Sequence, residues 1–182
     1  RTSKGIVDRG IVRVVTAGTI TEEDELDSRA SNYLAALLLD SGRAGLAWVD
    51  LSTGRAAACD IPLDRVMDEL ARVAPAELLV PEDLPRTAPE LAEQLQLDLA
   101  QRITWREPWR FARETCRRVL HEQFKVKTLE GFGFADDALG VCAAGAAVEY
   151  AVETQRGSCE HLLRLERVDT GQHLVLDRAT RS

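Results

Sequence analysis

The sequence has few aromatic residues and no long apolar run. Phe, Trp and Tyr make up 5% of its 182 residues, and Met occurs once. The longest apolar segment with helical spacing, residues 139–154, contains Glu149 and Glu153, so we expect no transmembrane helix and no membrane partner. With 45% hydrophobic and 29% charged residues, the composition excludes a disordered or fibrous chain and is typical of a globular domain.

The sequence also lacks the cysteine and histidine patterns of metal sites. No Cys-x-x-Cys pair occurs, and three of the four cysteines lie in segments with apolar periodicity, so we predict buried, reduced thiols and a cytoplasmic protein. The three histidines have neither His-x-x-x-His nor Glu-x-x-His spacing, and Gly-x-Ser-x-Gly is missing. We therefore expect no metal, no cofactor and no catalysis in this chain.

The first third of the chain carries strand signals. β-Branched residues fill residues 10–16, and residues 46–50 and 55–59 form a predicted hairpin around the turn at residues 51–54 (LSTG). Residues 32–40 (NYLAALLLD) remain open between helix and strand. Ala and Leu favour a helix, whereas the turn signal that follows favours a hairpin.

After Pro62 the pattern alternates between helices and strands. The first predicted helix ends near Pro75 and has an apolar face of Leu63, Val66, Met67, Leu70 and Ala71. Further helices are predicted at residues 89–97, 112–124 and 139–154, and strands at residues 77–82, 103–105 and 173–177. A meander followed by alternating helices and strands predicts an α/β domain with a mixed sheet.

Two glycine patterns approach those of nucleotide-binding loops but lack the required partners. Residues 140–145 (GVCAAG) are followed by two alanines where a phosphate loop needs Lys and Ser or Thr, so we predict that these small residues serve helix packing. Residues 131–133 (GFG) lack the third glycine of a dinucleotide loop. We predict a turn there, before a helix capped by Asp136 or Asp137.

Seven short segments, in order and at suitable spacing, resemble the MutS family of DNA mismatch-recognition proteins, and specifically its second, or connector, domain. They are residues 13–19 (RVVTAGT), 32–36 (NYLAA), 50–54 (DLSTG), 75–82 (PAELLVPE), 129–133 (LEGFG), 143–155 (AAGA with Tyr150 and ETQ) and 176–181 (LDRATR). The ordered series, which covers nearly the whole chain, carries the resemblance.

The resemblance implies an α/β fold with a ribonuclease H-like mixed sheet flanked by helices, in which residues 32–40 form the first strand of the meander. It divides the chain into a linker from a missing mismatch-recognition domain (residues 1–9), the connector domain (10–162) and the truncated start of a core or lever domain (163–182). The chain starts at Arg1 without Met. We therefore expect it to be a piece of a longer protein.

The resemblance also implies a role in DNA mismatch repair. It implies a parent protein that binds mismatched DNA, forms a homodimer, and binds ATP and Mg²⁺ at a site outside this chain. The connector itself is expected to be non-catalytic. The resemblance implies that it joins the mismatch-recognition domain to the core and ATPase domains and offers a surface to a MutL homologue.

Two alternatives remain open. Nucleases with a ribonuclease H-like fold hold two metal ions with clustered carboxylates, and Asp40, Asp50 and Asp60 near predicted strand ends are the candidates here. Capping of turns is the structural interpretation of the same residues. The second alternative is a structural piece that binds no partner of its own.

The charge of the chain is unevenly distributed. Residues 101–127 carry eight basic and three acidic side chains, a local net charge of +5 in a chain of net charge −7. This segment is either a docking face for an acidic partner or nucleic acid, or a solvated helix with i, i+4 pairs such as Arg110 with Glu114. Because the whole chain is acidic, we expect weak DNA binding by itself. The predicted partner-binding residues, all expected to be exposed, are Arg110, Arg113, Arg117 and Arg118.

Overall fold

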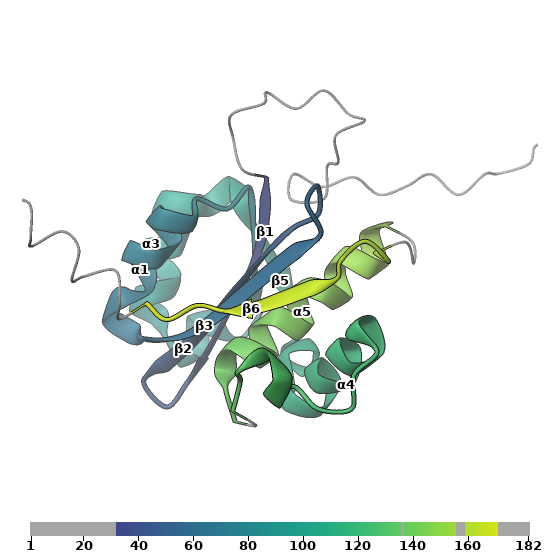
Figure 1. Ribbon diagram of the computed structural model, residues 1–182. Helices are drawn as coiled ribbons and strands as arrows, with labels where there is room; N and C mark the ends of the chain where they lie inside the picture. The colour runs from purple at the N-terminus through teal and green to yellow at the C-terminus, as the bar shows by residue number, and fades with distance from the viewer. Residues whose placement is uncertain (1–31, 136, 156–158, 171–182) are drawn as a thin grey trace, which may run out of the picture.

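The structure, a computed structural model, describes residues 32–135, 137–155 and 159–170 (Figure 1). These residues form one mixed sheet with the strand order β5-β4-β1-β2-β3-β6. The strands are β1 (Tyr33–Asp40), β2 (Arg43–Asp50), β3 (Arg55–Pro62), β4 (Glu77–Pro81), β5 (Ile103–Arg106) and β6 (Arg164–Arg167). The helices are α1 (Val66–Val73), α2 (Leu84–Thr87), α3 (Pro89–Leu99), α4 (Arg113–Phe124) and α5 (Leu139–Gln155). The strands predicted at residues 10–16 and 173–177 lie outside the described residues.

The centre of the sheet is an antiparallel meander of β1, β2 and β3. In the segment that the sequence left open, residues 33–40 form β1. The turn after this strand places Ser41 and Gly42 at positive φ, as a tight hairpin requires. β4 pairs with β1, β5 with β4, and β6 with β3, each in parallel. The predicted α/β class with a mixed sheet flanked by helices is confirmed.

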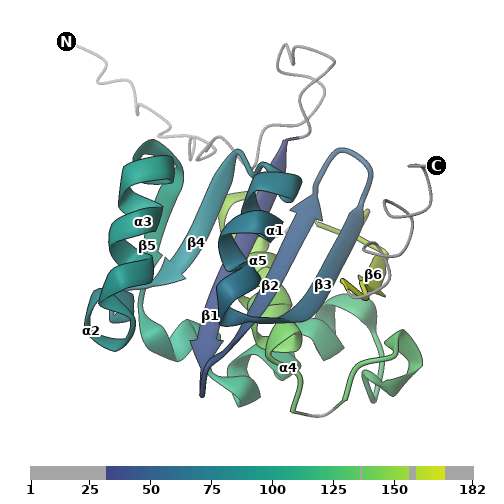
Figure 2. The same ribbon diagram turned by 90° about the vertical axis from the view of Figure 1, so that its left-hand side faces the viewer.

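Helices cover both faces of the sheet (Figure 2). On one face, α1 and α3 bury Val66, Leu70 and Leu95 against the strands. On the other face, α5 lies directly on β1, β2 and β3, and α4 packs against α5. The predicted apolar face of the first helix was partly wrong. Leu63 and Ala71 are exposed, because the chain forms a 3-10 turn before α1 and the helix buries Val73 in their place.

α5 is buried along most of its length, and glycines allow its close contacts. A Cβ atom on Gly45 of β2 would lie 2.2 Å from the backbone of Leu139, and one on Gly145 would lie 2.3 Å from Cβ of Cys116 in α4. The region of residues 140–145 is therefore helical and packed between backbones, as the small residues predicted. A phosphate loop does not form there.

The first turn of α5 is capped from the sheet. The Asp60 carboxylate of β3 accepts hydrogen bonds from the backbone N–H groups of Leu139 (3.3 Å) and Gly140 (2.6 Å). The sequence suggested Asp136 or Asp137 for this role, and Asp136 lies outside the described residues. Asp60 satisfies N–H groups that the helix itself leaves without acceptors.

β6 is an edge strand of the sheet and pairs with β3. Leu165 is buried, while the charged residues on either side of it face solvent on this edge strand. Edge strands with charged side chains resist further pairing. The pairing of β6 with β3 runs from Arg164 to Arg167.

Candidate partner-docking surface

The basic segment of the sequence is built on α4 and the 3-10 turn before it, Pro108–Phe111 (η4). Cys116 and Leu120 bury one side of α4 against α5, and Cys116 Sγ donates a hydrogen bond to the carbonyl oxygen of Arg110 (3.1 Å). The helix ends at Phe124, followed by Lys125 in the left-handed conformation. α4 is thus fixed on its inner side and presents the opposite side to solvent.

The four arginines predicted to bind a partner differ in exposure. Arg113 and Arg118 are exposed on α4, and Arg117 is half-buried. The prediction that Arg110 is exposed was wrong, because its side chain is only 17% exposed. Its guanidinium pairs with Glu107, the residue before η4, and with carboxylates of α5, instead of with Glu114 of the following helix.

Arg110 is the centre of an ion-pair cluster. It contacts Glu107 at 2.8 Å, Glu149 at 3.1 Å and Glu153 at 3.6 Å. Partial burial lowers the pKa of Arg110, but hydrogen bonds with Glu107 and Glu149 outweigh this effect and raise the pKa above its ordinary value. The guanidinium also lies 4.6 Å from the ring centre of Trp109. Arg110 therefore joins η4 to α5.

A second arginine extends this cluster to the sheet. Arg106, in β5, pairs with Glu153 and lies over the ring of Tyr150 at 4.9 Å. The Tyr150 hydroxyl donates to the buried carboxylate of Glu77 in β4 (2.7 Å), which also accepts from the Thr104 hydroxyl (2.7 Å). These contacts connect the sheet, α5 and η4 in one polar network.

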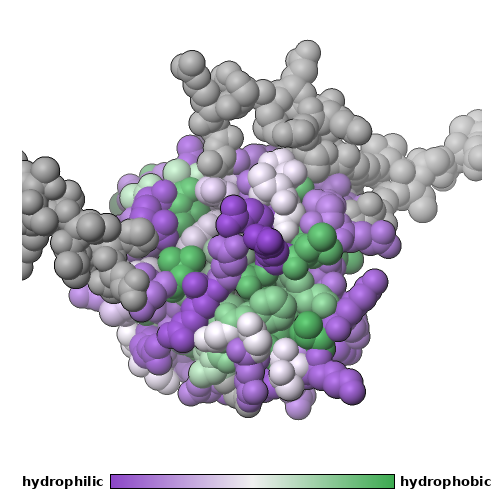
Figure 3. All heavy atoms as spheres, in the orientation of Figure 1, coloured by the Kyte–Doolittle hydropathy of each residue, from purple (hydrophilic) through white to green (hydrophobic). Residues whose placement is uncertain are grey.

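An apolar area lies on the surface between β6 and α4 (Figure 3). A groove of about 430 Å³ lies between the end of α4 and the segment before β6, where Phe124, Val152 and Leu163 form apolar walls. Gln123 bonds to the carbonyl oxygens of Cys159 and Leu162 beside this groove. The end of α4 is therefore tied to the segment that leads into β6.

The three carboxylates proposed for a nuclease do not converge. In the antiparallel register Asp50 lies opposite Tyr33, at the other end of β1 from Asp40, about 23 Å away at roughly 3.3 Å a residue. Asp60 caps α5 and pairs with Arg43. This set cannot form one metal site. Among residues 32–135, 137–155 and 159–170, no group of three or more His, Cys, Asp or Glu side chains is arranged to hold a metal ion.

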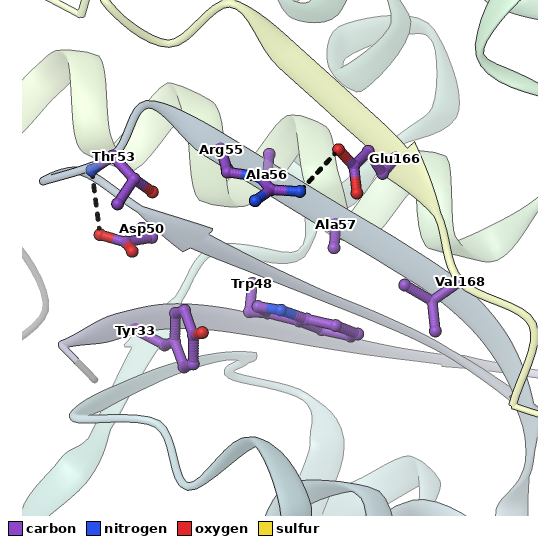
Figure 4. Close-up of a pocket in the computed structure, with 9 residues that line it drawn as sticks. All are labelled: Tyr33, Trp48, Asp50, Thr53, Arg55, Ala56, Ala57, Glu166 and Val168. Atoms are coloured by element: carbon purple, nitrogen blue, oxygen red, sulfur yellow. Dashed lines mark hydrogen bonds and ion pairs between the residues drawn. The ribbon is translucent and has the colours of Figure 1, made fainter. Parts of the chain in front are cut away.

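Asp50 instead fixes the turn between β2 and β3. Its carboxylate accepts from the backbone N–H and hydroxyl of Ser52 and from the backbone N–H of Thr53. Burial raises the pKa of Asp50, but these hydrogen bonds outweigh burial and hold the pKa below its ordinary value. Asp50 lines an open pocket of about 350 Å³, with Trp48 and Tyr33 on its other side (Figure 4).

The four cysteines are buried and free, as predicted. Burial and the nearby Glu69 raise the pKa of Cys59 to about 12, which leaves a thiol of low reactivity. Among the described helices, none combines the length and the apolar character needed to cross a membrane.

The family model for MutS domain II matches residues 32–163. The chain belongs to the MutS family. The match starts one residue before β1 and ends one residue before β6, so it spans the sheet and helices described above except for the last strand. The domain is the MutS connector, and the mixed six-stranded sheet is its fold. Its family places it in a MutS-like mismatch repair protein.

Two features of this connector were not predicted from the sequence. The cap on α5 comes from Asp60, far away in the chain, and nothing local in the sequence marks it. Trp109 is 54% exposed beside α4, and a large aromatic residue within a charged segment is a signal that could have singled it out.

Proposed function

We propose that this connector is a non-catalytic link between domains of a mismatch repair protein and that its α4 surface receives a MutL homologue. The α4 surface comprises Arg113, Arg117 and Arg118. The observation that carries the proposal is the exposure of Arg113 and Arg118 on a helix whose opposite side is held by α5.

The rigidity of α4 supports a docking role. Gly145 brings the α4 and α5 backbones into contact, and the pairs of Arg110 with Glu149 and Glu153 fix the turn that precedes α4. A surface that is ordered before binding loses less entropy when a partner docks. The backbone that carries the arginines of α4 is therefore in place before a partner docks.

The charge pattern of α4 favours a protein over DNA. Glu114 and Glu122 are exposed one helical turn before and after Arg118. DNA presents uniformly negative phosphates, which the two carboxylates would repel. A protein surface can match alternating charges, and such complementarity sets both specificity and association rate.

The remaining tasks of the parent protein are assigned to parts outside this chain. We place mismatch recognition, the ATP and Mg²⁺ site and the homodimer contacts there, on the basis of the family. The structural roles of Asp50 and Asp60 support a connector without metal-dependent catalysis. In this proposal the connector links its neighbouring domains, couples their movements and carries the α4 surface.

The test is calorimetric titration of the chain with the MutL homologue from the same source at about 150 mM salt, with a mismatched duplex as the comparison ligand. We expect saturable binding of the MutL homologue and no measurable binding of the duplex. Arg118→Glu should weaken partner binding at least tenfold, or by about 1.4 kcal/mol. The matched control is Arg86→Glu, an 81% exposed arginine of α2 on the opposite side of the sheet.

Three results would contradict the proposal. Equal affinity of the wild type and Arg118→Glu would remove the α4 surface from the interface. Binding of the duplex without binding of the MutL homologue would make the basic segment a nucleic-acid surface. Cleavage of the duplex that depends on Mg²⁺ or Mn²⁺ would contradict the non-catalytic role.

A further inference from the structure

Trp109 stands out among the exposed apolar side chains. Of the described residues, four large hydrophobic ones are exposed, namely Leu63, Leu97, Trp109 and Leu163. Trp109 is the aromatic member of this group and is 54% exposed. Burying an exposed indole ring against a partner removes apolar surface from water, which is favourable. Trp is also enriched among the residues that contribute most of the binding energy in protein interfaces.

The ring is held in place rather than free to rotate into the core. The Arg110 guanidinium lies 4.6 Å from its centre, and that guanidinium is itself held by Glu107, Glu149 and Glu153. One face of the ring is thus covered by a fixed cation. An aromatic side chain fixed in this way binds at low entropic cost.

The backbone beneath Trp109 is equally fixed. Its carbonyl oxygen accepts from the N–H of Ala112 (3.1 Å), and the N–H of Arg110 donates to the carbonyl oxygen of Glu107 (3.0 Å). The neighbouring Phe111 is buried at 3% exposure and anchors η4 in the core. Trp109 therefore projects from a rigid turn.

Trp109 and the exposed arginines are close enough in the chain for one partner to contact all of them. Arg113 follows Trp109 by four residues. Arg118 lies five residues further along α4, an axial rise of about 7.5 Å at 1.5 Å a residue. A standard interface buries about 800 Å² on each partner, which is wide enough to include all three side chains. The carboxylates of Glu107, Glu149 and Glu153 are already paired with Arg106 or Arg110. The exposed cations of α4 therefore set the charge available to a partner.

We propose that Trp109 is the apolar anchor of the α4 surface and that the protein docking there has an apolar pocket for an indole ring, bordered by carboxylates that face Arg113 and Arg118. This inference rests on the proposed function and names the chemistry of the partner. The ring enters the pocket, and the arginines set the orientation around it.

Affinity measurements with three variants test the anchor. Trp109→Ala should weaken binding of the MutL homologue by about 30-fold or more, as expected for a central aromatic residue, and Trp109→Phe should weaken it less. The control is Leu97→Ala, a 78% exposed residue of α3 that lies on the other face of the sheet, and its affinity should equal that of the wild type. Circular dichroism of each variant checks that the fold is retained.

A second measurement uses the unsubstituted chain. Labelling with 5-fluorotryptophan gives three ¹⁹F resonances, from Trp48, Trp105 and Trp109, and the Trp109→Phe variant assigns the third. Saturation with the MutL homologue should shift the Trp109 resonance and leave the half-buried Trp48 and Trp105 in place.

The outcomes separate the anchor from the proposed function. If Arg118→Glu weakens binding while Trp109→Ala binds as the wild type does and its resonance stays unshifted, the anchor is wrong and the docking surface stands. If neither substitution affects a measurable interaction, both proposals fail. Loss of affinity in both variants, with a shifted Trp109 resonance, supports both.

Discussion

Replacing Asp60 with Ala should destabilise the connector by about 2 kcal/mol. The substitution removes a charged acceptor from the N–H groups of Leu139 and Gly140, at 3.3 and 2.6 Å. Loss of a helix cap costs about 1 kcal/mol, and a hydrogen bond to a charged group contributes about 1.5–3 kcal/mol. Because Asp60 is 20% exposed, water replaces part of the lost contact, so we take a value near the middle of this range.

Two further variants divide this effect into its parts. Arg43→Ala removes only the ion pair with Asp60, and the Arg43 side chain is 62% exposed, so we expect a loss of about 0.5 kcal/mol or less. Asp60→Asn retains one oxygen acceptor for the helix and should lose about 1 kcal/mol. The expected order of stability is wild type, Arg43→Ala, Asp60→Asn and Asp60→Ala.

Urea unfolding followed by circular dichroism measures these differences. A loss of about 2 kcal/mol corresponds to a fall in Tm of roughly 6 °C for a domain of this size. If Asp60→Ala is no less stable than Arg43→Ala, the cap contributes nothing and the reasoning about the start of α5 is refuted.

Two other predictions concern α4 with α5 and the β2–β3 turn. Gly145→Ala should destabilise the fold by about 1–2 kcal/mol, because overpacking against the Cys116 backbone outweighs the gain in helix propensity. Gly131→Ala, with open space around its Cβ position, is the control and should change stability by less than about 0.5 kcal/mol in the same urea assay. The lowered pKa of Asp50 contributes stability above its unfolded value of about 3.8, and this contribution is lost as pH falls through the lower folded value. Asp50→Asn should therefore flatten the dependence of stability on pH below about pH 4, and an unchanged acid titration would contradict this account.

Most of the helices could be predicted from the sequence, because their apolar faces repeat locally. α5 and α3 follow from helical spacing within their own segments. β1 was harder to predict. It is buried on both faces, with Leu34 in one core and Leu37 in the other, so it lacks the alternation of a half-buried strand. β6 has a single buried residue and is specified by its pairing with β3 rather than by its own sequence.

The candidate docking surface could be predicted only in part. The charge excess of residues 101–127 identified the correct segment for exposed arginines, and Arg113 and Arg118 are exposed. The exposure of Arg110 depends on Glu149 and Glu153, which the fold brings from a different helix. A rule based on i, i+4 neighbours considers only partners on the same helix, so it could not find this pair.

The attachment of α5 at both of its ends sets how the connector responds to load. Asp60 holds its first turn to β3, and Glu149 and Glu153 hold its last turns to η4 and β5. A force applied at α4 therefore passes through α5 to the central strands, because α5 is packed against both. Within the described residues, α5 is therefore the element that couples η4 and α4 mechanically to the centre of the sheet.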